Sequence, residues 1–271
     1  MLIDSHCHLN YDSLSHDLDT VLLEAKSSGV EAIQTICTKI SEFDTILKIA
    51  NKLTNSNMPQ LFCSVGTHPC EIQNEKLFDR SEIASLCANQ LVIGIGETGL
   101  DYYHNNDPEL IRLQKQSFIE HIGAAQITGL PLIIHTRDAE ADTVAIIKEQ
   151  MAIQQFSGVI HCFTSDLNSA LKYIDLGLYI SASGIVTFKN ATMIQDAFAK
   201  IPIERILVET DSPYLAPVPY RSRPNRPAYV TEVARQIANL RQVEYNAICE
   251  ATTQNFFRLF TKAKNSFTGS I

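Results

Sequence analysis

The sequence predicts an alternating α/β fold that closes into a (β/α)8 barrel. Short apolar runs alternate eight times with longer amphipathic stretches, and most of these runs are uninterrupted, as expected for parallel strands covered on both faces. No G-x-G-x-x-G or P-loop marks the first turn of a doubly wound sheet. The chain has 271 residues, of which 45% are hydrophobic, so it can bury a large core without disulfides.

The eight expected strands follow one another at the intervals of successive βα units. They are Leu2–Cys7, Glu31–Cys37, Leu61–Gly66, Leu91–Glu97, Pro131–His135, Gly158–Cys162, Leu178–Ala182 and Ile206–Thr210. The sequence has no internal repeat and no Pro/Gly/Ser linker. We therefore predict one domain over residues 1–260 and a polar C-terminal tail of uncertain order over residues 261–271.

Helices are expected between these strands. Residues 18–25 and 230–237 carry apolar side chains at the i, i+3, i+4, i+7 spacing of one helix face. Asp107 followed by Pro108 is typical of a helix start, with an N-cap residue before a proline in the first turn. Glycines typical of helix ends stand at Gly29, Gly129 and Gly177.

Composition limits the partners and the compartment. The formal net charge is −8, which argues against chromatin-like or anionic-membrane roles and leaves phosphate binding to metals or to a confined basic loop. The seven scattered cysteines contain no C-x-x-C pair, which indicates free thiols in a reducing compartment. We find no secretory leader and no long apolar stretch, so we expect a cytoplasmic protein without a membrane partner or an obligate protein partner.

Five of the eight apolar runs end in side chains that bind metals: His6 and His8, Glu97, His135, His161 and Asp211. The carboxyl ends of parallel barrel strands open on one face, so these six residues are predicted to converge there. His6 and His8 are two residues apart on a strand and point to the same side, while Cys7 points away. Each histidine alone is explained better by a hydrogen-bonded core position, but their joint occurrence favours a metal centre.

Six candidate ligands exceed the three that one catalytic zinc needs, which predicts two divalent cations. A bridging anion must hold the two ions together against their repulsion, and Glu97 is the natural bridge. The nitrogen and oxygen ligands suit Zn, Mn, Co or Fe, with Mg a weaker choice and Ca a poor one. One ion would be completed by His6, His8 and Asp211, and the other by His135 and His161.

Five motifs in order along the chain resemble those of the TatD family. They are Ile3-Asp4-Ser5-His6-Cys7-His8, Gly66-Thr67-His68-Pro69, the segment Gly94 to Tyr103, His135-Thr136-Arg137-Asp138-Ala139, and Glu209-Thr210-Asp211-Ser212-Pro213-Tyr214. The resemblance covers Met1 to about Phe260. It implies a metal-dependent hydrolase on a TIM barrel with the active site at the carboxyl ends of the strands. The activity implied is that of a deoxyribonuclease of 3′→5′ exonuclease type.

That activity gives the residues roles. Two cations would lower the pKa of a shared water, and the resulting hydroxide would attack phosphorus in line. Asp211 would orient this water or take its proton, with Glu97 as the bridge. His68 matches a family motif and could contact a phosphate oxygen or assist the leaving group, although a capping or core role remains open. Asp4 and Glu209 each precede a proposed ligand by two residues and are expected to orient ligands rather than bind metal.

Basic and aromatic residues on the same face are candidates for binding DNA, in particular single strands or 3′ ends. Arg137 suits a bidentate phosphate contact, with an ion pair to Asp138 as the alternative. A basic segment follows the eighth strand and is a candidate for binding phosphate, with solvated surface arginines as the alternative interpretation. TatD-like chains would carry glycine and lysine at the positions of Ser222 and Arg223. The segment contains Arg221, Arg223 and Arg226. The candidates for walling the pocket or stacking on bases are Tyr102, Tyr103, Tyr214 and Tyr220.

Metal ligands alone do not choose the leaving group. A metallohydrolase of the same fold acting on esters or amides, such as an aminoacyl-tRNA deacylase or a lactonase, is one alternative, and the arginine-rich segment favours a phosphate substrate over it. A non-catalytic nucleic-acid-binding protein is another, and the intact ligand set weighs against it. The remaining histidines (His16, His104 and His121) and all seven cysteines are expected to be structural or surface residues.

Overall fold

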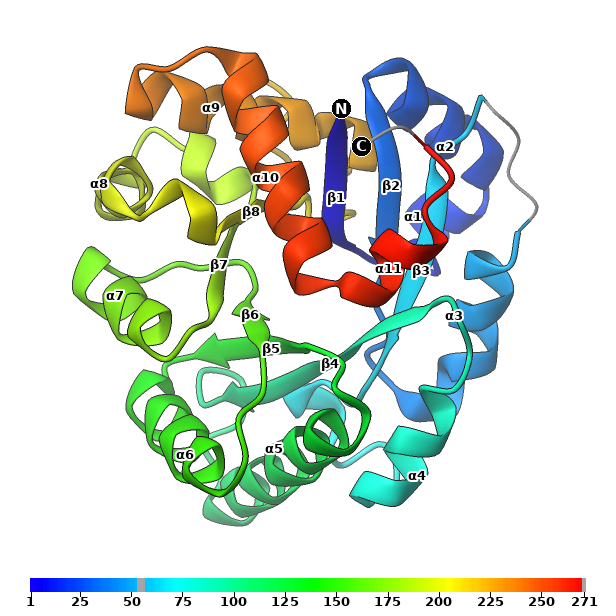
Figure 1. Cartoon of the computed structure of the whole chain (residues 1–271), viewed down its shortest axis with the longest axis vertical. Helices are drawn as coiled ribbons and strands as arrows, with labels where there is room; N and C mark the ends of the chain where they lie inside the picture. The colour runs from blue at the N-terminus through cyan, green and yellow to red at the C-terminus, as the bar shows by residue number, and fades with distance from the viewer. Residues whose placement is uncertain (53–56, 270–271) are drawn as a thin grey trace.

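The computed structural model describes residues 1–52 and 57–269, in which eight parallel strands pair in chain order (Figure 1). Helices between the strands lie outside the ring that the strands form. The predicted (β/α)8 barrel is therefore confirmed. The strands are β1 (Leu2–Cys7), β2 (Val30–Thr35), β3 (Gln60–Val65), β4 (Val92–Asp101), β5 (Leu132–Arg137), β6 (Gly158–Ile160), β7 (Tyr179–Ala182) and β8 (Ile206–Val208).

The helices begin and end with the expected local chemistry. The Asp107 carboxylate caps the 21-residue helix α5 by accepting hydrogen bonds from two backbone amides of the first turn, and Gly129 ends that helix in the left-handed conformation. The α-helices of the described residues are α1 (Asp12–Ser15), α2 (Leu18–Ser27), α3 (Phe43–Ala50), α4 (Arg80–Leu86), α5 (Pro108–Thr128), α6 (Glu140–Ile153), α7 (Leu167–Asp175), α8 (Thr192–Lys200), α9 (Val230–Arg241), α10 (Tyr245–Leu259) and α11 (Thr261–Ser266). None of these helices is long and apolar enough to cross a membrane.

The largest difference from the predicted strands is at β4, which continues past Glu97 to Asp101. The pairing register with β5 shifts between Ile95 and Thr98, so the strand bulges at this point. Gly99 makes the continuation possible: its φ is +136°, and a Cβ there would lie 2.0 Å from the His135 carbonyl oxygen. Gly96 and Gly99 therefore permit close contact with β5.

The barrel interior is filled below the carboxyl ends by one apolar side chain from each strand and by the C-terminal helices. Figure 1 shows α10 and α11 lying across the ring on the viewer's side. Because these helices cover that opening, the carboxyl ends open on the opposite face. The buried strand residues of this cluster are Ile3, Ala32, Phe62, Ile93, Ile133, Val159, Tyr179 and Leu207, and those of the C-terminal segment include Phe256, Phe257, Phe260 and Ala263.

The start of the predicted polar tail is ordered as helix α11. Ala263 is fully buried, and Phe260 before it and Phe267 after it belong to the same apolar cluster. Three apolar residues spread over eight positions of otherwise polar sequence gave too short a pattern to predict a helix. Residues 270–271 of that predicted tail lie outside the described residues.

The barrel closes between β1 and the segment after β8. The Asp211 amide donates to the His6 carbonyl at 2.9 Å, and the His8 amide donates to the Ser212 carbonyl at 2.8 Å. Cys7 and Ser212 form a parallel bridge between these hydrogen bonds. The closure therefore brings Asp211 beside His6 of β1 and His8, which follows that strand, although about two hundred positions separate them in the sequence.

Candidate metal centre

The six predicted ligands converge at the carboxyl ends of the strands, and His68 joins them. Glu97 lies among them, and its two carboxylate oxygens face different histidines. Oε2 is 3.3 Å from Nε2 of His6. Oε1 is 2.7 Å from Nε2 of His161, 3.0 Å from Nδ1 of His135 and 3.3 Å from Nε2 of His68. This arrangement is the one a bridging carboxylate needs, with each oxygen directed to a separate group of nitrogens.

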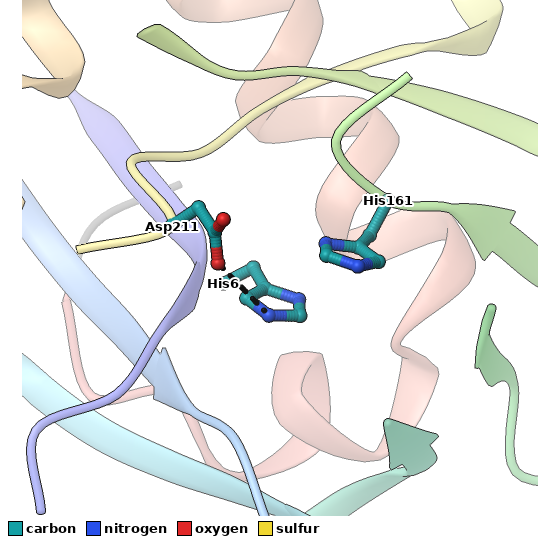
Figure 2. A group of neighbouring side chains, drawn as sticks. All are labelled: His6, His161 and Asp211. Carbon is teal, nitrogen blue, oxygen red and sulfur yellow. Dashed lines mark ion pairs between the residues drawn. The ribbon is translucent and has the colours of Figure 1, made fainter. Parts of the chain in front are cut away.

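Asp211 faces the Oε2 side of Glu97. Its Oδ1 atom is 3.2 Å from Nε2 of His8 and 3.6 Å from Nε2 of His6. Figure 2 shows the Asp211 carboxylate directed at His6, whose ring lies beside that of His161. The two rings stack with centroids 4.0 Å apart and planes 8° apart. The nitrogens of the two groups are therefore adjacent, close enough for neighbouring ions.

Backbone constraints fix these two carboxylates. Asp211 has a φ of +56°, an uncommon value for a non-glycine residue that surrounding hydrogen bonds must maintain. Glu97 lies on the bulge of β4, where its amide donates to the Cys37 carbonyl at 2.9 Å. A Cβ on Gly66 of the neighbouring loop would lie 2.5 Å from the Gly96 Cα, so only glycine permits the two backbones to approach there. The close contact between Gly66 and Gly96 thus permits the bulge, from which the Glu97 side chain points into the site.

The charge states of His6 and Glu97 fit divalent cations. Burial is the largest cause that lowers the pKa of His6, followed by neighbouring His161, so its ring is neutral. Both of its ring nitrogens, and Nδ1 of His8, are buried without a hydrogen-bond partner among the described residues. Burial raises the pKa of Glu97, but the adjacent His161 and His68 outweigh it and hold the pKa well below its ordinary value. Unpartnered imidazole nitrogens beside ionised carboxylates are the donor set that such cations bind.

Two histidines on the other side of Glu97 are held by further carboxylates. Nδ1 of His161 lies 3.3 Å from Oε1 of Glu209, which also accepts a hydrogen bond from the Cys162 amide. Nε2 of His135 lies 3.0 Å from Oδ2 of Asp101. A carboxylate on the outer nitrogen fixes the ring and leaves the inner nitrogen free for a ligand. The inner nitrogens are thus Nε2 of His161 and Nδ1 of His135.

Sequence reasoning gave no role to Asp101. Its carboxylate is buried, and although burial raises its pKa, hydrogen bonds from His135 and His104 hold the pKa below its ordinary value. The available signal is the aspartate in the middle of Gly-Leu-Asp-Tyr-Tyr, which lies beyond the strand predicted to end at Glu97. Asp4 lies near the site as expected, but it accepts hydrogen bonds from the amide and hydroxyl of Thr210 and holds that loop rather than a ligand ring. Burial raises the pKa of Asp4 to about 8.

His68 is oriented by its own loop. Its Nδ1 accepts a hydrogen bond from the Cys70 amide at 3.0 Å, so the neutral ring carries its proton on Nε2, the atom directed at Glu97. The loop is fixed from below by buried His121, whose Nε2 accepts from the Thr67 amide at 3.0 Å while its Nδ1 donates to the Ser117 carbonyl at 2.8 Å. His121 is therefore structural, as predicted.

His121 predicts a pH dependence of stability. Burial lowers its pKa from 6.5 to about 4, so between pH 7 and 5 the unfolded chain takes up a proton that the folded chain does not. The free energy of unfolding therefore decreases as the pH is lowered from 7 to 5, and the share of His121 in this decrease is about 2 kcal/mol. The His121→Gln side chain has an amide that can keep both hydrogen bonds. Between pH 7 and 5, the free energy of unfolding of this variant is expected to decrease by about 2 kcal/mol less than that of wild type, as measured by urea unfolding with a chelator present. An equal loss would contradict the assignment, and His16→Gln, at an exposed site, controls for removing an imidazole.

The predicted substrate residues lie in two regions of the rim. At the end of β5, the Arg137 guanidinium stacks on the exposed ring of Tyr103, 3.9 Å from its centroid. The ion pairs among the described residues do not include one between Arg137 and Asp138. The Tyr102 hydroxyl donates to Asp142 at 2.7 Å, so this side chain is tied to α6. Near β1, the exposed Tyr214 packs edge-on against His8 and Tyr11.

In the basic segment after β8, some of the arginine side chains already contact other residues of the protein. Arg226 pairs with Glu24, and Arg221 lies 3.7 Å over the ring of Phe188 while donating to the Ala216 carbonyl. Tyr220 stacks on Tyr229, which leaves it a packing role. The exposed side chain of Arg223 is the one best placed for a solution partner.

Comparisons with known proteins agree with this architecture. Residues 3–261 match the family model described as TatD related DNase. YcfH of Escherichia coli K12, named an uncharacterized metal-dependent hydrolase, is 44% identical over 262 residues, which cover 96% of this chain and 95% of YcfH. YabD of Bacillus subtilis, named likewise, is 38% identical and covers 96% and 99%. The crystal structure of YjjV, a TatD homolog from Escherichia coli, superposes with a TM-score of 0.84 at 26% identity over 96% of this chain and 98% of that one. A match over almost the whole length of the barrel places this chain in the TatD family of metal-dependent hydrolases.

Proposed function

We propose that this metal-dependent hydrolase is a deoxyribonuclease that cleaves phosphodiester bonds of DNA from the 3′ end. The observation that carries the catalytic part is Glu97, whose two oxygens face separate groups of nitrogens. That geometry supports two divalent cations, drawn from Zn, Mn, Mg and Co, with His6, His8 and Asp211 on one side and His135 and His161 on the other. The choice of DNA is supported by the family description and by the arginines of the rim.

The residues divide the chemistry between them. Cations held at this site would supply an activated water and neutralise charge on the phosphoryl oxygens. Asp211 is directed toward the same space from the outer side of His6, where its carboxylate orients the attacking water or accepts its proton. His68 presents an Nε2 proton from the opposite side, where it donates to a phosphate oxygen or to the leaving oxygen. An acid and a base on opposite sides suit an in-line displacement.

The rim residues are proposed to hold the strand. Arg137 and Arg223 would contact phosphates, with Arg221 shaping the same basic segment. Tyr103 and Tyr214 present exposed rings on which bases can stack, whereas Tyr102 shapes the pocket wall through its bond to Asp142. Because the whole chain is acidic, DNA binding without metal is expected to be weak at physiological salt.

The central experiment measures bound metal per chain and the degradation of single-stranded DNA with EDTA, Mg, Mn, Co or Zn. Oligonucleotides labelled at the 3′ or the 5′ end report the direction of cleavage. We expect metal-dependent degradation that EDTA abolishes and that His6→Ala and Glu97→Ala both lack. Degradation that persists in both variants would come from a contaminant. Two bound ions without degradation, but with turnover of an aminoacyl ester or a lactone, would overturn the nuclease assignment.

Arg223 offers a test of the basic segment. Arg223→Ala is expected to weaken binding of single-stranded DNA about equally for all sequences and to reduce the slope of log affinity against log salt by about 1, because one phosphate contact is lost. Fluorescence anisotropy at several salt concentrations measures both effects. Arg258→Ala, on α10 at the other end of the barrel, is the matched control. An unchanged slope in Arg223→Ala would remove this residue from the binding surface.

A further inference from the structure

We propose that Cys70, Asp101 and His104 form a binding site for one zinc ion, separate from the proposed two-cation centre. The three residues come from different segments: Cys70 from the short 3-10 turn Pro69–Glu71 after β3, Asp101 from the end of β4, and His104 from the loop that follows. The inference goes beyond the proposed function, because it does not depend on the substrate.

The geometry brings three kinds of ligand atom together. The Cys70 sulfur, one carboxylate oxygen of Asp101 and one ring nitrogen of His104 all lie within 4.8 Å of one another. Nδ1 of His104 is 2.9 Å from Oδ2 of Asp101, and the His104 amide donates to Oδ1 at 2.8 Å. These hydrogen bonds turn the His104 ring back over the carboxylate. Small rotations of the three side chains would bring the ligand atoms to the distances that zinc requires.

The Asp101 carboxylate has room for an ion. A carboxylate offers about four acceptor positions, and three are occupied by Nε2 of His135, the ring of His104 and the amide of His104. The Cys70 thiol is a further donor to this carboxylate, and its position opens when the thiol loses its proton to bind the ion. A cation between His104 and Cys70 would replace the ring hydrogen bond and leave the other two in place. Oδ2 would then bind zinc with one lone pair and keep holding His135 with the other, while Oδ1 keeps the His104 amide.

The chemistry of the ligands identifies the ion class. One sulfur, one imidazole and one carboxylate make a set that favours zinc over magnesium or calcium, which take oxygen ligands. The site is reachable, because the His104 side chain is 50% exposed and Cys70 is partly exposed. Three protein ligands leave the fourth tetrahedral position to water. An ion here would connect the loop after β3, which carries His68, to the end of β4, where Asp101 holds the His135 ring.

The test uses cobalt as a spectroscopic substitute for zinc. The whole protein is stripped with a chelator and titrated with Co²⁺ while the thiolate-to-cobalt charge-transfer absorption in the near ultraviolet is recorded. None of the ligands in the proposed two-cation centre is a thiolate, so this band reports sulfur ligation alone. We expect the band in wild type and in His6→Ala, and its loss in Cys70→Ser. The absence of the band in folded wild-type protein would overturn the proposal.

Two further variants separate the site from its neighbours. Cys162→Ser removes the other partly exposed thiol, which stands next to His161, and is expected to keep the band. A band that survives in Cys70→Ser and disappears in Cys162→Ser would assign the sulfur to the centre and overturn the proposal. His104→Ala, at a half-exposed position, is expected to weaken the band and to bind one zinc fewer per chain than wild type. Equal zinc content in wild type, His104→Ala and Cys70→Ser would also overturn it.

Discussion

Glu97→Gln is expected to reduce kcat/KM for DNA by about 10³-fold or more, the largest loss among single substitutions of this chain. The change removes one negative charge from the carboxylate that lies between the two groups of histidines. It also replaces one acceptor oxygen with an amide that presents hydrogens to the neighbouring imidazoles. Electrostatic stabilisation by bound cations is worth several kcal/mol, and each 1.36 kcal/mol corresponds to about tenfold in rate.

Metal content and turnover are measured together for this variant. We expect fewer than two ions per chain after equilibration with Mn or Zn, and low turnover even in excess metal. Glu149→Gln, an exposed residue of α6, carries the same charge change and should behave as wild type. Glu209→Gln is a graded comparison, because that carboxylate acts only through His161 and an outer partner of this kind contributes about 10- to 100-fold. Full metal content with turnover within tenfold of wild type would show that Glu97 is not the bridge.

Much of this site could be predicted because it follows from where strands end. Uninterrupted apolar runs marked the strands, and in a parallel barrel every residue that follows such a run faces the same opening. Glu97 and Asp211 were found in this way without knowledge of any contact. The rule needs only the position of each residue on its strand, which a single sequence supplies.

The parts that could not be predicted depend on backbone detail. Asp101 was missed because β4 passes through a bulge and continues four residues beyond Glu97, where the apolar run had predicted its end. The ring nitrogens that His135 and His161 direct inward depend on Asp101 and Glu209, which belong to other βα units. The covering of the barrel by α10 and α11 depends on Phe260 and Ala263 meeting side chains from the strands, a contact between distant segments that no local pattern reports.

Asp211→Asn tests the chemistry rather than the assembly of the centre, and it is expected to lower kcat by about 10²- to 10⁴-fold while retaining bound metal. Burial raises the pKa of Asp211, but His8 and His6 outweigh it and hold the pKa below its ordinary value, so this side chain is a carboxylate at neutral pH. Asparagine keeps its shape and one oxygen, yet it cannot take a proton.

The comparison between Asp211→Asn and Glu97→Gln separates the two roles, because each removes one charge from the same cluster. If Asp211 acts on the attacking water, its variant keeps metal content and KM near wild type while kcat falls at every metal concentration. If Asp211 serves only to hold an ion, excess metal should restore kcat in Asp211→Asn. Near wild-type turnover in a fully metal-loaded Asp211→Asn protein would remove the residue from the catalytic step. Proton acceptance would then have to come from elsewhere in the site, with His8, 3.2 Å from the Asp211 carboxylate, the nearest candidate.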